Sequence, residues 1–160
     1  MTSPTTVERI SDREIIATRT LAAPVPLVFD AWTKPDLIMR WWAPASFGIA
    51  FLSCETDVRT GGGYRYVFSH PDLAEPMAFF GRYIEVAPPS RLVWTNEEAA
   101  DGAVTTVTFD AQEGRTRVVV HDLYPTREAL DAAISSGGTG AWPEQFEALE
   151  ELLAPSNPSP

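Results

Sequence analysis

Six strand patterns follow one another between residues 46 and 123, and they constrain the fold of this chain more than any other feature. Each pattern is rich in β-branched and aromatic residues, which strands favour. The patterns cover residues 46–58, 61–70, 76–86, 90–98, 103–111 and 115–123. Four of the connections carry the Gly, Pro or Asp that tight turns require: residues 60–63, 88–90, 101–102 and 113–114. Because short turns join antiparallel neighbours, the sequence predicts an antiparallel meander.

Another strand and two short helices precede this meander. Residues 13–21 are rich in β-branched residues and predict the first strand. In residues 23–42 the apolar period becomes helical, and Val28, Ala31 and Trp32 share one face. We expect Pro35 to end one helix and begin the next, because proline fits only the first turn of a helix.

The C-terminal part of the chain is predicted to be helical, with one interruption. Residues 126–134 predict a helix with Thr126 as its N-cap. The glycine-containing segment 135–140 follows, where a plain loop or a hinge near a cavity entrance is expected. Beyond it, apolar residues recur at helical spacing: Trp142, Phe146, Leu149 and Leu153.

This order of elements predicts an α+β helix-grip fold. A meander of this size twists and curls, so that one face becomes concave. We expect a curved antiparallel sheet of about seven strands to wrap around a long C-terminal helix. The two short helices after strand one would then close one end. The predicted domain covers residues 12–153, between flexible tails at residues 1–11 and 154–160.

Composition limits the partners and the compartment that this chain is expected to have. Its formal net charge of −10 opposes binding to nucleic acid or to anionic lipid, and no apolar run is long enough to span a bilayer. A single cysteine, Cys54, favours a reducing cytoplasm. His70, His121 and Cys54 are too scattered to predict a metal site. We therefore expect no nucleic acid, membrane, metal or cofactor, while a homodimer is left open.

Four segments resemble a known family. "APVPLVFDAWTKPDLIMRWWAP", "DVRTGGGYRYVF", "FFGRYIEVAPPSRLVWT" and "WPEQFEALEELL" are similar to the activator-of-Hsp-ATPase homologue group of the START-like, or SRPBCC, superfamily. The resemblance implies a seven-stranded sheet around a C-terminal helix, often with a cavity between them. It implies no single activity, because members include hydrophobic-ligand carriers, cyclase-like enzymes and resistance proteins.

Large aromatic side chains recur at alternate positions of the predicted strands. Tyr64, Tyr66 and Phe68 share one face of their strand, and Phe79 and Glu85 share one face of theirs. Such faces predict either a filled core or a pocket lined by aromatic rings. The residues expected to contact a ligand are Trp42, Phe47, Tyr66, Phe68, Phe79, Trp94, His121, Trp142 and Phe146.

The neighbouring Trp41 and Trp42 cannot share one helical face, because adjacent helical residues diverge by about 100°. We expect one ring to pack on the sheet and the other to point toward the cavity mouth or solvent. That both are ordinary core residues is the alternative.

A catalytic role has only weak candidates. His121 is the best general acid or base, because its ordinary pKa lies near neutrality, although a structural role is also open to it. Glu85, Asp122 and Tyr124 are further candidates, and Cys54 is expected to be a small buried hydrophobe.

Binding of a small hydrophobic or aromatic molecule is the function that these features favour. An enzyme acting on an aromatic or polyketide-like substrate is one alternative. A co-chaperone of an Hsp-type ATPase is another, and it is implied only by the family name.

Overall fold

The structure is a computed structural model that contains four helices and eight strands within its described residues. The described residues are 5–43, 48, 50–97, 100, 102–135 and 142–153. Phe47 and most of the segment 135–140 lie outside them, so their predicted roles are not addressed by the structure.

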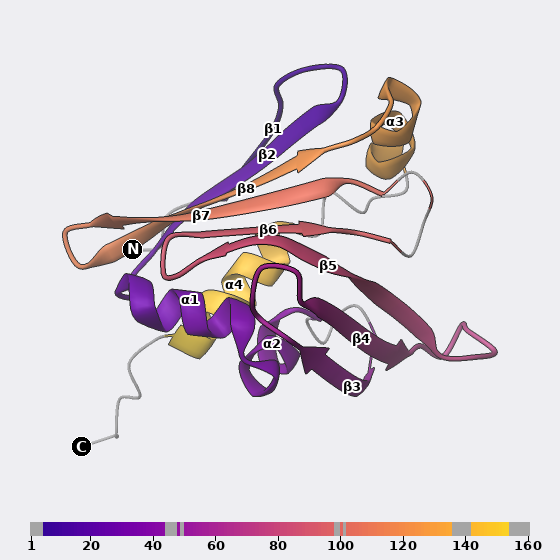
Figure 1. The fold of residues 1–160 in the computed structure, drawn as a ribbon, viewed down its shortest axis with the longest axis horizontal. Helices are drawn as coiled ribbons and strands as arrows, with labels where there is room; N and C mark the ends of the chain where they lie inside the picture. Colours follow the sequence, from indigo (N-terminus) through magenta and orange to yellow (C-terminus); the bar gives the residue numbers. More distant parts are fainter. Residues whose placement is uncertain are drawn as a thin grey trace.

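A single curved antiparallel sheet dominates the molecule (Figure 1). Its strands are β1 (Thr6–Arg9), β2 (Glu14–Leu21), β3 (Ala50–Thr56), β4 (Gly63–Ser69), β5 (Met77–Ala87), β6 (Arg91–Thr95), β7 (Val104–Gln112) and β8 (Arg115–Leu123). Their spatial order is β1-β2-β8-β7-β6-β5-β4-β3. The predicted six-strand meander is confirmed as β3 to β8, and β2 joins it by pairing with β8.

The N-terminal segment differs from the expectation of a flexible tail over residues 1–11. Thr6–Arg9 forms β1, which pairs with β2 in a register that sets Val7 opposite Ala17. All four side chains of β1 are exposed. A strand without a buried face has no apolar alternation, and this is why its sequence pattern did not indicate a strand.

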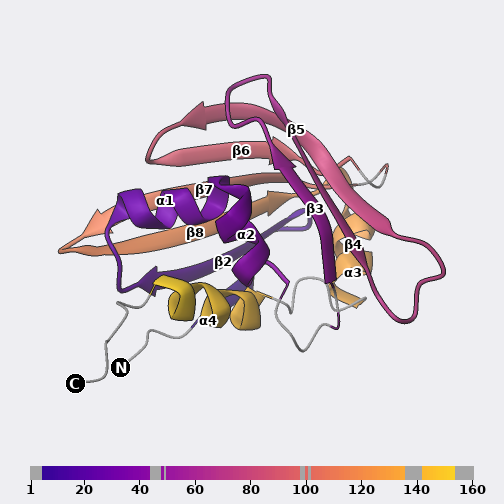
Figure 2. The same ribbon diagram turned by 90° about the horizontal axis from the view of Figure 1, so that it is seen from below.

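Three of the four helices cover one face of the sheet (Figure 2). They are α1 (Val25–Thr33), α2 (Pro35–Trp41) and α4 (Trp142–Leu153), while α3 (Arg127–Ser135) lies at one end of the sheet. We call the face that carries α1, α2 and α4 the inner face. No helix in the described ranges is long and apolar enough to cross a membrane.

Local signals in the sequence set the helix boundaries. Pro35 begins α2 as predicted, and the backbone N–H of Lys34 closes α1 by donating to Asp30 at 2.9 Å. Thr126 caps α3, because its Oγ1 accepts a 3.0 Å hydrogen bond from the backbone N–H of Ala129.

Strand alternation places aliphatic side chains from β2, β7 and β8 under α1 and α4. These residues and the helix residues that meet them form what we call the filled core: Leu21, Val28, Trp41, Leu92, Val107, Val118, Val120, Phe146 and Leu149, each at most 1% exposed. Burial of this much apolar surface is the main stabilising contribution to the fold. It also fixes α4 to the sheet.

One ion pair and one hydrogen bond orient α4 on the sheet. The Arg19 guanidinium of β2 lies on the inner face, where it pairs with Glu150 of α4. The Gln145 side chain of α4 donates a 2.6 Å hydrogen bond to the Trp42 carbonyl beside α2. The first contact fixes the position of α4 relative to β2, and the second fixes it relative to α2.

Candidate ligand-binding interior

A second group of inner-face residues, which we call the aromatic end, lies under α2 on β3, β4 and β5. It consists of Trp42, Phe51, Cys54, Tyr64, Tyr66, Phe68, Phe79 and Tyr83. Tyr64, Tyr66 and Phe68 alternate on β4 and are nearly buried, so the predicted inward face of this strand is confirmed. Trp42, Phe51 and Phe79 are only partly buried. The aromatic end is therefore an inner wall with some access to solvent.

The paired tryptophans divide between the two groups of residues. Trp41 is 1% exposed, and its Nε1 donates a 2.8 Å hydrogen bond to the Ala31 carbonyl. Trp42 instead lies against the aromatic end, with its ring 5.2 Å from Phe79 and 5.4 Å from Tyr66. The expectation that the two rings diverge is confirmed. Both rings point inward, however, so neither is a free surface group.

Trp32 of α1 is the centre of the aromatic interior. Its ring packs against those of Trp41, Trp94, Phe109, Trp142 and Phe146, at centroid distances from 4.7 to 6.4 Å. The indole is 5% exposed, yet its buried Nε1 donor has no hydrogen-bond partner among the residues that the structure describes. A buried donor without a partner costs about 1–3 kcal/mol, so this group stands ready for an acceptor from a ligand.

A chain of polar side chains crosses the inner face beside these rings. The Tyr64 hydroxyl donates to the Thr95 carbonyl at 2.7 Å and lies 3.3 Å from Asn96 Oδ1. Asn96 Nδ2 donates to Thr105 Oγ1 at 2.9 Å, and this hydroxyl donates to Asp122 Oδ1 at 2.5 Å. The chain links β4, β6, β7 and β8 and ends at a carboxyl group.

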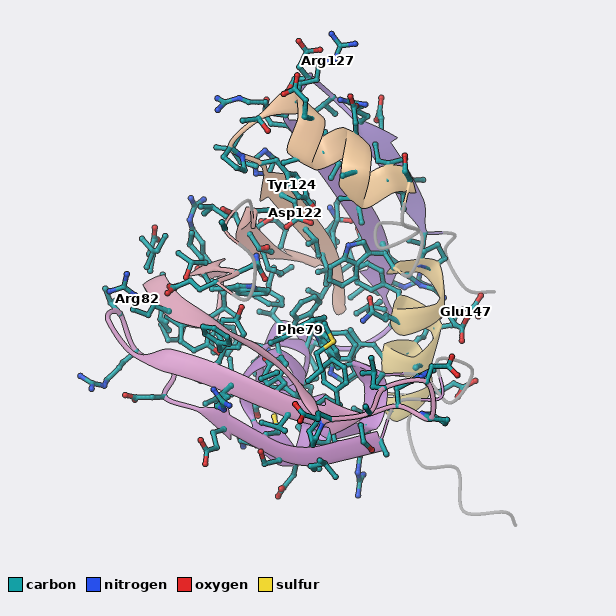
Figure 3. The ribbon with its side chains drawn as sticks, turned by 90° about the vertical axis from the view of Figure 1, so that its right-hand side faces the viewer. Phe79, Arg82, Asp122, Tyr124, Arg127 and Glu147 are labelled. Atoms are coloured by element: carbon teal, nitrogen blue, oxygen red, sulfur yellow. The ribbon has the colours of Figure 1, made fainter. Side chains whose placement is uncertain are left out.

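Asp122 lies at the edge of an apolar hollow. Val7, Ile15, Ile16, Ala17, Val120 and Trp142 line the hollow together with Asp122. Desolvation in this setting raises the pKa of Asp122 to about 6, against the smaller opposing effects of the Thr105 hydrogen bond and of His121. Figure 3 shows Asp122 and Tyr124 beneath α3, with Phe79 across the interior from them.

The hollow is closed in this conformation. The residues around Asp122 leave no room for a water-sized molecule. A ligand can therefore enter only if a side chain moves. Trp142 borders the hollow and stacks on Trp32 at 6.0 Å, and it is the first residue of α4.

His121 does not reach this interior, contrary to our expectation. It lies between Val120 and Asp122, which face inward, so its side chain is on the outer face of β8. There its Nε2 lies 2.9 Å from Glu14 Oε1, and this contact is the main reason that the pKa of Glu14 is lowered. Val118, Val119 and Val120 are all apolar, so the sequence does not show which face of β8 is the inner one. The direction of the His121 side chain could therefore not be predicted from it.

Glu85 is also outside the interior. The pairing of β5 with β6 shifts between Tyr83 and Glu85, as it does at a β-bulge, so Val86 instead of Glu85 packs on the core. The Glu85 carboxylate lies 3.4 Å from Arg91 Nε, and its side chain is 47% exposed. The prediction from simple alternation was wrong here because a bulge reverses the face of every residue after it.

The other predicted ligand-contact residues that the structure describes face inward. Trp42, Tyr66, Phe68 and Phe79 belong to the aromatic end, Trp94 contacts both groups, and Trp142 and Phe146 project from α4. Phe146 is fully buried. That any of them contacts a ligand stays a prediction. Sequence reasoning missed Thr105 and Asn96, whose only signal was their place on the same face as Trp94.

The outer face of the sheet carries a separate and open groove of about 500 Å³. Its lining includes Phe80, Arg65 and Arg82, with carboxylates from Glu55 and Glu97 nearby. The Arg65 guanidinium lies over the Phe80 ring at 5.9 Å, and Arg82 pairs with Glu97 at 3.3 Å. Both arginines of this groove therefore already have partners within it, Arg65 at the Phe80 ring and Arg82 at the Glu97 carboxylate.

The curved sheet, the C-terminal helix on its inner face and the aromatic interior between them define a helix-grip, START-like domain. The family model described as "Activator of Hsp90 ATPase homolog 1-like protein" matches residues 22–154, and the chain belongs to this family. The resemblance found in the sequence is thereby confirmed.

Solved structures show the same fold. A protein from Rhodobacter sphaeroides is 25% identical, with a TM-score of 0.85 over 96% of this chain and 99% of its own. A protein from Nitrosomonas europaea is 24% identical, with a TM-score of 0.81 over 91% and 96% of the two chains. An AHSA1-like protein from Aeromonas hydrophila has a TM-score of 0.68 at 22% identity, over 89% and 98% of the two chains. No match was found among curated proteins.

Proposed function

We propose that this domain binds a small apolar or aromatic molecule between the sheet and α4. Folds of this type commonly bind hydrophobic ligands, and this supports the general class. The observation that carries the proposal is an aromatic interior in which, within the described part of the chain, the Trp32 indole N–H has no hydrogen-bond partner and the Asp122 carboxyl group accepts a hydrogen bond from Thr105 at one oxygen. Binding sites of small molecules have this composition, with mostly apolar walls and a few converging polar groups.

Entry of a ligand requires the interior to open, because the hollow beside Asp122 is closed. The aromatic end provides the less tightly packed wall, since several of its rings are only partly buried. A ligand that separates Trp142 from Trp32 would exchange one ring contact for another, which keeps the cost of opening small. Tryptophan fluorescence should therefore report binding directly.

The test uses two neighbouring phenylalanines of β5 that face opposite ways. Phe79 belongs to the aromatic end, whereas Phe80 lies on the outer face and is 37% exposed. Titration of the purified protein with 1-naphthalenemethanol is followed by calorimetry and by tryptophan fluorescence. We expect saturable binding whose Kd changes more than about threefold in Phe79→Ala and stays unchanged in Phe80→Ala.

Two results would contradict the proposal. The first is that naphthalenemethanol does not bind and that native mass spectrometry of the purified protein shows no retained small molecule. The second is binding that depends on Phe80 and not on Phe79, which would move the site to the outer groove.

An enzyme is the second candidate function, and Asp122 is the observation that favours it. A carboxyl group with a pKa of about 6 can exchange a proton near neutral pH inside an apolar site. His121 and Glu85, which the sequence had offered for this role, lie on the outer face and away from the interior. Conversion of a bound ligand that is lost in Asp122→Asn, with binding retained, would distinguish an enzyme from a carrier. The co-chaperone hypothesis has no support beyond the family's description.

A further inference from the structure

The polar chain on the inner face has a fixed direction. The Thr105 hydroxyl accepts a hydrogen bond from Asn96 Nδ2, so its single proton is the one donated to Asp122 Oδ1. Asn96 also donates to the Ala103 carbonyl at 2.7 Å. The two contacts from Asn96 through Thr105 to Asp122 therefore run in one direction, toward the carboxyl group. The second carboxyl oxygen, Oδ2, has no hydrogen-bond partner among the described residues, and Asp122 is one of the residues that line the hollow.

No positive charge on the inner face balances Asp122 among the described residues. Its neighbours there are Ile15 of β2, Thr105 of β7, Val7 of β1 and Trp142 of α4, none of which is ionisable as a cation. On the outer face, His121 acts on the carboxyl group only through space.

Several ionisable groups on the surrounding elements are engaged in contacts with one another. His121 is held by Glu14, which also accepts a hydrogen bond from Ser11. On α3, Asp131 pairs with Arg9 of β1 at 2.7 Å. On α4, Glu150 pairs with Arg19.

We propose that the natural ligand carries a basic amine on an aromatic or other apolar body, and that its ammonium group pairs with Asp122 Oδ2. This inference rests on the proposed function, since it names the class of molecule that the same interior takes. A protonated amine supplies both features that the site lacks, namely a hydrogen-bond donor for the open oxygen and a positive charge for the carboxylate. A ligand carboxylate would instead meet a like charge in an apolar site and be repelled.

The sign of the expected pH dependence follows from the titration of Asp122. Burial raises its pKa to about 6, so the carboxylate form is dominant at pH 8 and the neutral form at pH 5. An amine ligand stays protonated over this range, and its affinity should rise with pH through 6 and then level off. A ligand that offers only an acceptor would show the opposite trend, because it requires the protonated carboxyl group.

The experiment compares three probes with one ring system, 1-naphthylmethylamine, 1-naphthalenemethanol and 1-naphthoate, by calorimetry at pH 8 and pH 5. We expect the amine to bind about tenfold tighter than the alcohol at pH 8, the range of a charge-assisted hydrogen bond. The naphthoate should bind most weakly. At pH 5, about one unit below the pKa of Asp122, the preference for the amine should shrink about tenfold.

Two variants separate Asp122 from the general negative charge of the protein. Asp122→Asn keeps the Thr105 acceptor but removes the charge, so it should bind amine and alcohol with equal affinity. Asp110→Asn removes an exposed charge from the neighbouring β7 and should retain the preference. If Asp122→Asn does not fold, the pH series on the unmodified protein remains decisive, because no preference or an inverted one contradicts the proposal.

The outcomes also distinguish this inference from the proposed function. Binding of the alcohol without any preference for the amine would overturn the amine ligand and leave an apolar binding site standing. A preference for the amine that survives in Asp122→Asn would assign it to the acidic surface and equally overturn the role of Asp122. Failure of all three probes to bind would overturn the amine ligand, and together with the absence of a retained small molecule in native mass spectrometry it would overturn the proposed function as well.

Discussion

The filled core and the aromatic end line the same inner face of one sheet, yet they are built from different residues. Aliphatic side chains make up most of the filled core, together with the rings of Trp41 and Phe146, and all of them are essentially unexposed. The aromatic end consists mainly of aromatic side chains, three of them tyrosines, and it includes rings that stay partly exposed. Close packing leaves a fully buried side chain little room to move, whereas a partly exposed ring has protein neighbours on only part of its surface. The comparison separates a fully buried half that holds α4 from a partly exposed half, and we expect the first to be rigid and the second to adapt to a ligand.

The largest expected effect is a difference in the free energy of unfolding between matched truncations in the two halves. Phe146→Ala should lower the free energy of unfolding by about 3–5 kcal/mol, because a ring that is completely buried leaves a cavity. Phe79→Ala should cost about 1–2 kcal/mol, since part of this ring is already exposed. Urea unfolding at pH 7 measures both values. Equal losses would contradict the distinction between a rigid and an adaptable half.

A smaller effect concerns Asp122, which lies where the filled core meets the hollow. Its pKa is raised by burial to about 6 in the folded protein, so the folded state binds more protons than the unfolded state below that pH. The free energy of unfolding should therefore fall by roughly 1–1.5 kcal/mol as the pH rises from 5 to 8. In Asp122→Asn this fall should disappear.

Between pH 5 and 8, the effect of Asp122 titration on stability is separated from the effects of Glu14 and Glu97. Glu14 and Glu97 have pKa values below their usual range because of hydrogen bonds to His121 and Thr95, and their stabilising effect is lost only in more acidic solution. A fall that persists unchanged in Asp122→Asn would mean that the buried carboxyl group is not its source.

The smallest expected effect concerns the rate at which a disulfide reagent modifies the Cys54 thiol at the aromatic end. Desolvation raises the pKa of the Cys54 thiol to about 11, with Asp36 and Glu55 adding to the shift. At pH 8 roughly one molecule in a thousand carries the thiolate, so reaction with a disulfide reagent should be about a hundredfold slower than for a free thiol. Cys54 is the only cysteine, and a single absorbance trace therefore measures it. A rapid reaction would show that the aromatic end opens frequently even without ligand.

Much of the architecture could be predicted from the sequence because it depends on local signals. Turn residues and strand patterns defined the meander, Pro35 began α2, and Thr126 capped α3. The alternation of Tyr64, Tyr66 and Phe68 predicted their inner face correctly, since a strand without a bulge keeps a strict period of two.

The candidate site depended on features that have no local signal. A period of two tells which residues share a face but not which face is inner, and so the valine run of β8 left the direction of His121 open. The bulge in β5 turned Glu85 outward. The chain from Tyr64 through Asn96 and Thr105 to Asp122 joins four strands that are distant in the sequence.

The sequence by itself therefore determined the helix-grip fold, the family and the aromatic character of the interior. Only the tertiary structure decided that Asp122 and not His121 faces that interior, and that Trp41 and Trp42 enter different groups of residues. The physical reason is that hydrophobic periodicity and turn chemistry act along the chain. Register, bulges and the contacts of buried polar groups are fixed only when the strands have paired and α4 has packed against them.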